Sequence, residues 1–445
     1  MDRNKKKALS EVVVAAYIEQ VTQKNSTSPV SLSSCSSCCG LSGRLLQKLL
    51  RVPLACNGFA LGMTGLSNVL LNLNESLSPS PSPVKYSFIV AAILALFVAY
   101  VNQILYLAKI SVFPCKVLRE EASTPQQISA QVSHLTIPLL TSTTYSLLTS
   151  THMMNLDIGI LGLRIAQGIV AVWCTLQLVV MATFLLRSYR EGFYPEPAWF
   201  PPTVSLGTFA MAGAALKFPA ALIATSVWSA VIMMLVTLPI ALFRCYYRSK
   251  EVAINGSIGI LQAPGSFVCI CWLVSWSSLS SYSERQQLLL GPLFVGHALF
   301  AVAMLGMLST LWCVFMRRAH LKDLWFHSSF AGFTFPSASS ANATLLYVKF
   351  YGFDTYIVGK ACASVLAVLV VLLISIINIT WLGKLLHYCT GNLSTTARMP
   401  SAQSMDTSTS TSSGKEKKLF VSGSVPQQNL GASIGINTSP SMPQI

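Results

Sequence analysis

The sequence predicts an all-α integral membrane protein with ten transmembrane helices, and three observations carry this prediction. Of the 445 residues, 53% are hydrophobic and 10% are charged, with a mean hydropathy of +0.58, whereas soluble proteins carry about 25% charged residues. Ten hydrophobic spans follow one another, and most reach the roughly 20 residues that cross a bilayer. The odd-numbered spans contain helix-breaking residues, while most even-numbered spans are plain. The spans cover residues 53–73, 86–108, 133–151, 159–186, 200–217, 220–243, 258–278, 289–314, 328–348 and 355–382.

The spans divide the chain into three parts. A transmembrane domain over residues 49–388 lies between an N-terminal tail of residues 1–48 and a C-terminal tail of residues 389–445. The tails are rich in Ser, Thr, Gly and Asn, a composition typical of disorder. A Ser/Thr string ahead of the basic run Lys415–Lys418 makes the C-terminal tail a candidate substrate for a kinase.

The distribution of positive charge predicts the topology. Of the 30 Lys and Arg residues, 24 fall in the tails and the loops after even-numbered spans, and 6 fall on the other side. Cytoplasmic loops carry such an excess, so both tails are expected in the cytosol of a multi-pass plasma-membrane protein. The same rule explains most of the net charge of +15, so nucleic-acid binding is not expected. In the first external loop, the sequon at Asn74 is a possible glycosylation site.

Acidic residues are restricted to tails, loops and span ends. Proton and cation pumps usually need a carboxylate inside the membrane, so this pattern favours an anion or a neutral solute. The spans offer such a solute hydroxyls, amides, backbone N–H groups and the positive ends of broken half-helices. The alternative is that many of the Ser and Thr side chains only bond the preceding helical turn.

Paired in order, the spans form five αα hairpins that each begin with a disrupted helix. Five similar hairpins can close into a ring with the disrupted helices around a central pore; the alternative is an irregular bundle with scattered prolines. Candidates for lining the pore are polar, glycine and proline positions of the odd-numbered spans. They are Asn57, Gly58, Pro138, Thr141, Pro201, Thr203, Pro264, Gly265, Ser266, Pro336, Ser339 and Asn342.

The sequence contains no recognisable catalytic or nucleotide-binding motif at a position where it could act. We find no Walker loop, GxGxxG, HExxH or GxSxG motif and no paired carboxylates, so no enzyme activity and no cofactor are expected. The six His residues show no metal spacing, and the cysteines at Cys35, Cys38 and Cys39 lack a fourth ligand in their tail, so no metal site is expected.

Four stretches resemble one known family in order and spacing. They are Ala55–Gly62, Trp199–Val204, Ile258–Phe267 and Phe333–Thr344, and with them residues 50–388 resemble the tellurite-resistance/C4-dicarboxylate transporter family, which includes the plant slow-type anion channels. The resemblance implies a pseudo-fivefold ring of hairpins, assembled in the lipid bilayer as a homotrimer with one pore in each subunit.

The resemblance also implies that a phenylalanine of the ninth span occludes the pore. That position is Phe335 here, whereas Phe333 points to a different helix face and is expected to pack. The function implied is passive, gated transport of small anions such as chloride or nitrate. The alternatives are a carrier of dicarboxylate or sulfite, with or without proton coupling, and a sensor or scaffold that does not transport.

Overall fold

The computed structural model describes residues 49, 56–77, 83–114, 132–149, 156–190, 192, 197–247, 256–278, 294–316 and 331–390. Every regular element in these ranges is helical. The first residues of the predicted first span, the cysteine cluster and both predicted tails, except the last turn of the final helix, lie outside the described residues.

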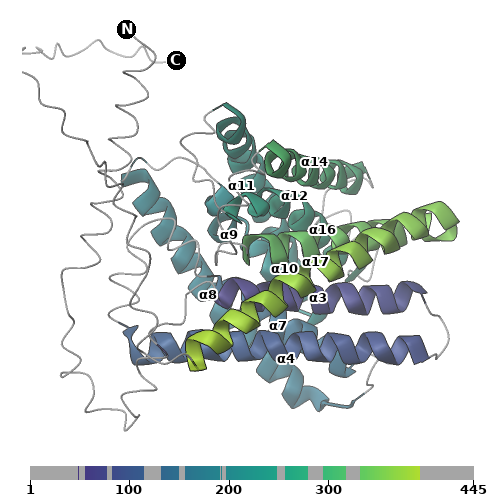
Figure 1. Ribbon diagram of the computed structural model, residues 1–445, viewed down its shortest axis with the longest axis horizontal. Helices are drawn as coiled ribbons and strands as arrows, with labels where there is room; N and C mark the ends of the chain where they lie inside the picture. The colour runs from purple at the N-terminus through teal and green to yellow at the C-terminus, as the bar shows by residue number, and fades with distance from the viewer. Residues whose placement is uncertain are drawn as a thin grey trace, which may run out of the picture. The chain divides into compact units, whose positions relative to one another are not determined.

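Ten longer helices follow one another in the described ranges, and they alternate between two groups (Figure 1). We call the first group the inner helices: α3 (Cys56–Leu77), α7 (Ser133–Thr149), α10 (Leu206–Ala215), α12 (Ala263–Ser278) and α16 (Ala331–Phe350). We call the second group the outer helices: α4 (Pro83–Val112), α8 (Gly159–Arg190), α11 (Ala220–Tyr247), α14 (Phe294–Met316) and α17 (Ile357–Thr390). Short helical segments join them: η3 (Pro197–Trp199), α9 (Phe200–Thr203), η4 (Gly256–Gln262) and η6 (Phe353–Thr355).

Contacts between the helices repeat in a regular order. Each inner helix contacts the outer helix that follows it, as α3 and α4 do where they lie side by side in Figure 1. The inner helices also contact one another in sequence, α3 with α7, α7 with α10, α10 with α12, and α12 with α16. Finally α16 contacts α3, so these contacts form a closed cycle. Each outer helix also touches the next inner helix of that cycle.

A buried aromatic cluster joins the first and last of these hairpins. The indole of Trp381 on α17 stacks on Phe59 of α3 with ring centroids 4.4 Å apart. Its Nε1–H donates a hydrogen bond of 3.1 Å to the Asn102 side chain of α4. Both partners of that bond are almost fully buried, so it is an interior link between segments more than 270 residues apart.

Burial separates the two groups. Among the described residues, every exposed large hydrophobic side chain lies on an outer helix or in the few residues that lead into one. The most apolar windows of the outer helices are 22–39% buried, whereas the window that contains α12 is 89% buried. The outer helices therefore expose apolar side chains along much of their length, as lipid-facing helices do.

Six stretches are long and apolar enough to cross a membrane: the five outer helices and residues Ile258–Ser278. These stretches support a polytopic membrane protein. The other inner helices do not meet that description. Helices α7 and α10 have only 17 and 10 residues, and α3 and α16 are diluted by Asn, Ser, Thr and Gly. The ten crossings stay a prediction, because polar helices surrounded by protein carry a weak hydropathy signal.

The prolines interrupt some of the predicted spans and not others. The fifth span is split into α9 and α10, and the seventh begins as the 3-10 helix η4 before α12. The third and ninth spans are instead continuous, since α7 runs through Pro138 and α16 runs through Pro336. A proline removes one backbone hydrogen bond, which a helix can tolerate with a local bend when neighbouring segments support it.

Two glycines of α3 allow a close approach between α3 and α16. A Cβ atom added at Gly62 would lie 2.1 Å from the Thr334 Oγ1 atom and 3.3 Å from the Phe335 backbone nitrogen. One turn later, a Cβ at Gly65 would lie 2.8 Å from the Ala338 Cβ. Small residues let helix backbones come together in this way inside membranes. The two glycines therefore determine how near α16 stands to α3.

The substitution Gly62→Ala is expected to destabilise the protein. The added methyl group overlaps Thr334, which is fully buried and cannot move into solvent. Overpacking of this kind costs about 1–3 kcal/mol, and thermal unfolding of the purified protein should show a lowered midpoint.

Gly168→Ala on α8 is the matched control, because nothing lies within 4 Å of a Cβ added there. Since Ala favours a helix over Gly by up to about 1 kcal/mol, this variant should be unchanged or slightly more stable. Equal effects of the two substitutions would contradict the close packing of α3 against α16.

Candidate functional site

The inner helices carry few charges. Among the described residues of the five inner helices, α9 and η4, the only Asp, Glu, Lys or Arg side chains are Glu75 and Lys349. Both stand within two residues of a helix end, Glu75 on α3 and Lys349 on α16. The other side chains of these helices are mostly apolar groups, hydroxyls and amides.

An apolar cluster connects all five inner helices. Leu61 of α3 packs with Leu135 and Leu139 of α7, and Met211 of α10 and Phe335 of α16 complete the cluster. The fifth helix joins through Phe267 of α12, whose ring meets Phe335 edge to face with centroids 5.7 Å apart and planes at 60°. Apolar side chains from every member of the cycle are thus connected, those of α12 through Phe335, and we call this connected set the apolar layer.

The immediate surroundings of Phe335 fix its ring from two sides. Gly65 of α3 stands where a Cβ atom would be 3.4 Å from the Phe335 Cδ2 atom, and Phe267 supports the ring from α12. Phe335 and Met211 nevertheless remain partly exposed, whereas Leu61 and Leu139 are buried. A partly exposed side chain on an inner helix borders space that water can enter, so the layer has an accessible side.

Exposure along α3 identifies that side. Between Phe59 and Asn74, every residue of α3 is buried except Asn68 and Asn72. These two residues are four apart and therefore share one face of the helix. The only partly open strip of this buried helix is therefore made of two amides, on the Glu75 side of the apolar cluster.

Polar side chains link α3 to both of its neighbours in the cycle. The Thr143 hydroxyl of α7 donates to the Asn68 Oδ1 atom at 3.2 Å, and the Asn72 amide donates to the Asn342 Oδ1 atom of α16. On the other side of the apolar cluster, the Thr136 hydroxyl lies 3.3 Å from the Asn57 Oδ1 atom. Amide and hydroxyl groups thus flank the apolar cluster on both sides.

The predicted site residues are placed in different environments. Asn57, Asn342 and Phe335 are in the contacts just described, and the Gly58 carbonyl faces the Thr334 hydroxyl at 3.5 Å. Thr203 and Ser266 direct their hydroxyls to backbone carbonyls one turn earlier in the chain, at 2.7 Å in each case. The remaining positions Pro138, Pro264, Pro336 and Ser339 are buried, and Pro201 is partly buried.

Two predicted residues face outer helices. A Cβ atom at Gly265 would lie 2.8 Å from the Ala303 backbone, so Gly265 accommodates α14. Thr141 lines a groove of about 510 Å³ between α4, α7 and α8, together with apolar residues such as Ile104 and Ile165. These contacts place Gly265 against α14 and Thr141 in that groove.

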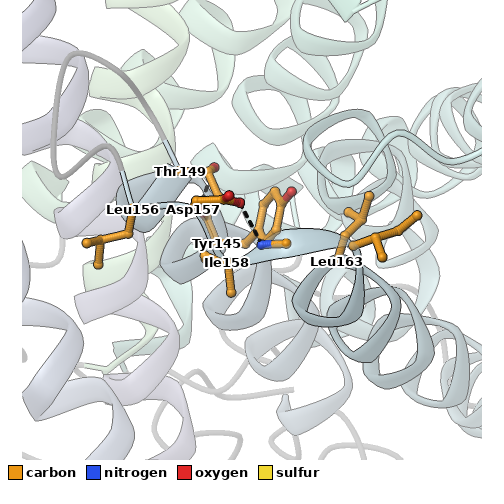
Figure 2. A pocket seen from close by; sticks show the side chains of 8 residues that line it. Tyr145, Thr149, Leu156, Asp157, Ile158 and Leu163 are labelled. Atoms are coloured by element: carbon orange, nitrogen blue, oxygen red, sulfur yellow. Dashed lines mark hydrogen bonds between the residues drawn. The ribbon is translucent and has the colours of Figure 1, made fainter.

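A second pocket of about 630 Å³ lies at the end of the same α7–α8 hairpin. Figure 2 shows its polar groups, Tyr145, Thr149 and Asp157, with the Asp157 carboxylate accepting a 2.9 Å hydrogen bond from the Gly159 backbone at the start of α8. The cluster of Leu61, Met211 and Phe335 contributes nothing to its lining.

The proposed glycosylation site is buried. Asn74 is 1% exposed within α3, and neither atom of its amide has a hydrogen-bond partner. A glycan needs an amide nitrogen that reaches solvent, so this burial argues against a glycan on the folded chain, and glycosylation of Asn74 stays a prediction.

Several residues of the site were not predicted from sequence. Leu61, Leu139, Met211 and Phe267 are ordinary apolar residues, and only the helix packing reveals that they meet. Glu75 and Lys349 had a visible signal, because each is a lone charge at the end of a disrupted span.

Comparison with known proteins places these features in a family. A family model described as voltage-dependent anion channel (SLAC1) matches residues 51–381. No individual curated protein matches the chain. Because the match covers most of the chain, the protein belongs to this family of slow anion channels and tellurite-resistance/dicarboxylate transporters. The resemblance predicted from the four sequence stretches is confirmed, and anion transport across a membrane is the activity that the family indicates.

Proposed function

We propose that the protein is a gated, passive channel for small monovalent anions such as chloride or nitrate. In this proposal the five hairpins form a pseudo-fivefold ring, and the inner helices enclose one pore in each subunit. The closed cycle of contacts among α3, α7, α10, α12 and α16 supports the ring. The repeated placement of each outer helix between two inner helices supports its fivefold character.

The observation that carries the proposal is the apolar layer around Phe335. Each inner helix contributes a side chain to it, and the layer lies at one end of the strip that Asn68 and Asn72 form on α3. An ion that entered such a layer would lose water that the side chains do not replace, which is how a hydrophobic constriction gates a pore. Phe335 is the natural gate because its ring is partly exposed and rests on Phe267 and Gly65.

The polar groups beside the layer favour an anion over a cation. The side-chain NH₂ groups of Asn68 and Asn72 each have two donor hydrogens, so both can turn a hydrogen toward an anion while the Thr143 hydroxyl holds the Asn68 oxygen. Among the described residues of the inner helices, Glu75 is the only acid, and it is paired with a lysine. A cation would meet no free carboxylate along this strip, whereas intramembrane cation sites usually contain one.

The exposed surface and the charge distribution bear on the oligomeric state and the orientation of the channel in its membrane. The exposed apolar face of the outer helices fits contact with lipid and with further copies of the chain, which supports a homotrimer in the membrane. The excess of Lys and Arg in the tails and the even-numbered loops supports cytosolic termini, with the plasma membrane as the site of action. The tails are the proposed place of regulation by a kinase.

The substitution Phe335→Ala is expected to open the channel. It removes the ring that fills the layer, so water and anions can pass and the basal anion current should rise many-fold without an activating signal. Voltage-clamp recording with chloride replaced by nitrate measures both the current and its selectivity. A channel also shows unitary current steps, which a dicarboxylate or sulfite carrier would not.

Phe333→Ala is the matched control, two residues away on the same helix. The Phe333 ring packs at Gly259 of η4 and beside Trp381 and Phe59, outside the apolar layer. Loss of a fully buried Phe ring costs about 3–5 kcal/mol of folding free energy. Because the Phe333 ring is only partly buried, its loss should cost less than this and should leave the gate closed. Silence from Phe335→Ala in cells that carry the protein on their surface would contradict the proposed gate.

A further inference from the structure

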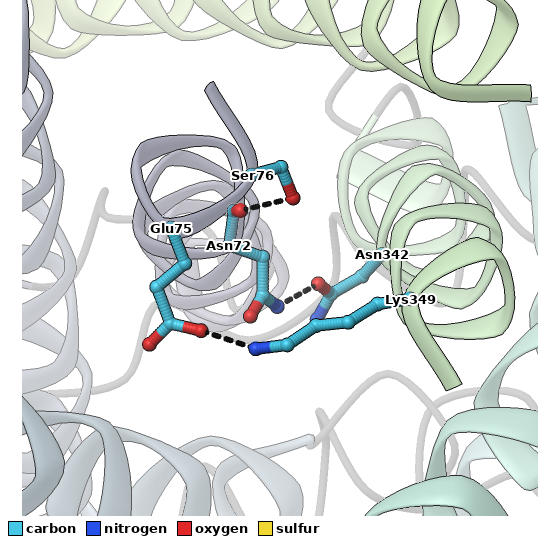
Figure 3. A network of polar contacts seen from close by, with 5 residues as sticks. All are labelled: Asn72, Glu75, Ser76, Asn342 and Lys349. Atoms are coloured by element: carbon cyan, nitrogen blue, oxygen red, sulfur yellow. Dashed lines mark hydrogen bonds and ion pairs between the residues drawn. The ribbon is translucent and has the colours of Figure 1, made fainter. Parts of the chain in front are cut away.

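One ion pair joins described residues of two inner helices, and it lies at one end of α3 and α16. The Lys349 ammonium is 2.7 Å from the Glu75 Oε2 atom. Figure 3 shows the two side chains meeting across the space between the helices, beside the amides of Asn72 and Asn342. No other Asp, Glu, Lys or Arg side chain occurs on the described inner helices, so this pair holds the fixed charges that these helices contribute to the path.

The register of both helices places the pair in line with the gate. Phe335, Asn342 and Lys349 follow one another at intervals of seven residues, two helical turns, and so lie on one face of α16. On α3, Asn68, Asn72 and Glu75 are spaced by four and three residues and share one face as well. The pair therefore ends the same polar strip that begins at the apolar layer.

Both partners are open to solvent, which makes the pair easy to break. The Lys349 side chain is 54% exposed and that of Glu75 is 31% exposed. Exposed ion pairs are weak and are screened by salt. A carboxylate that holds the ammonium this loosely can be exchanged for an anion from solution, since both bind the same –NH₃⁺ donors.

We propose that Lys349 is a docking site for small inorganic anions at this mouth of the pathway, and that Glu75 is a tethered carboxylate that competes with them. The inference rests on the proposed function and adds to it a determinant of conductance. With Glu75 in place the mouth is neutral and the ammonium is occupied. When an anion displaces Glu75, it stands at the head of the Asn72–Asn342 pair and can move along the amides toward Phe335.

The test uses the full chain with Phe335→Ala as the open background. Unitary chloride conductance is recorded at about 20 mM and about 1 M salt, where the Debye length shrinks from over 10 Å to about 3 Å. Glu75→Gln keeps the side-chain shape and removes the competing charge, so conductance at low salt should rise about threefold, within the range of electrostatic focusing. Lys349→Gln should lower it by a similar factor, and both effects should fade at high salt.

The double variant separates competition from an independent effect. If Glu75 acts by occupying Lys349, then Glu75→Gln combined with Lys349→Gln should conduct like Lys349→Gln alone. Arg164→Gln is the control, since Arg164 is an exposed cation on the outer helix α8 and should leave conductance unchanged. A double variant that conducts as much as Glu75→Gln alone would overturn the competition, as would salt-independent changes.

The outcomes also distinguish this inference from the function on which it rests. A current in Phe335→Ala that is indifferent to Glu75→Gln and Lys349→Gln overturns the docking site and leaves the channel intact. No anion current in Phe335→Ala overturns the channel, and the docking site falls with it.

Discussion

The contact between α3 and α16 at Gly62 and Gly65 is the constraint on which the rest of the site depends. A Cβ atom at Gly62 would fall 2.1 Å from the Thr334 Oγ1 atom, so the two helices approach more closely here than a larger residue at this position would allow. The same approach brings Phe335 onto Gly65 and, further along, Asn72 to Asn342 and Glu75 to Lys349. Phe335, the amide pair and the ion pair are thus successive levels of one interface between two helices that are far apart in the sequence.

The two groups of helices have different environments: the outer helices are exposed and apolar, and the inner helices are largely enclosed by protein. The outer helices keep large apolar side chains on their exposed faces, which lets the inner helices be short, polar and interrupted. A lone polar helix of this kind would be unfavourable in lipid, because its amides and broken turns would lack partners. Surrounded by apolar helices and linked to α7 and α16, the polar groups of α3 find hydrogen-bond partners inside the protein, and in the proposed function they form a strip that an anion can use.

Much of this arrangement could be predicted from the sequence. Hydropathy located the segments that became helices, and the alternation of disrupted and plain spans separated inner from outer helices. The side-by-side packing of distant helices has no signature in periodicity, so the meeting of Leu61, Met211 and Phe267 could not be foreseen. For the same reason a polar residue could not be assigned to a face, and Asn74 is buried while Thr141 faces α4 and α8. Proline marked the disrupted spans but did not show that α7 and α16 continue through it.

The central claim, that the partly open face of α3 lines the anion pathway, is tested most directly by cysteine accessibility. Single cysteines at Asn68 and Asn72, and at the buried positions Ser67 and Asn74, are placed in the Phe335→Ala background. In this background the exposed Cys362 and the cysteines whose exposure the structure does not describe are replaced by serine. A negatively charged thiol reagent is then applied while the anion current is recorded. We predict that cysteines at 68 and 72 react and block the current, and that those at 67 and 74 do not. Reaction at 67 and 74 with protection at 68 and 72 would contradict the account.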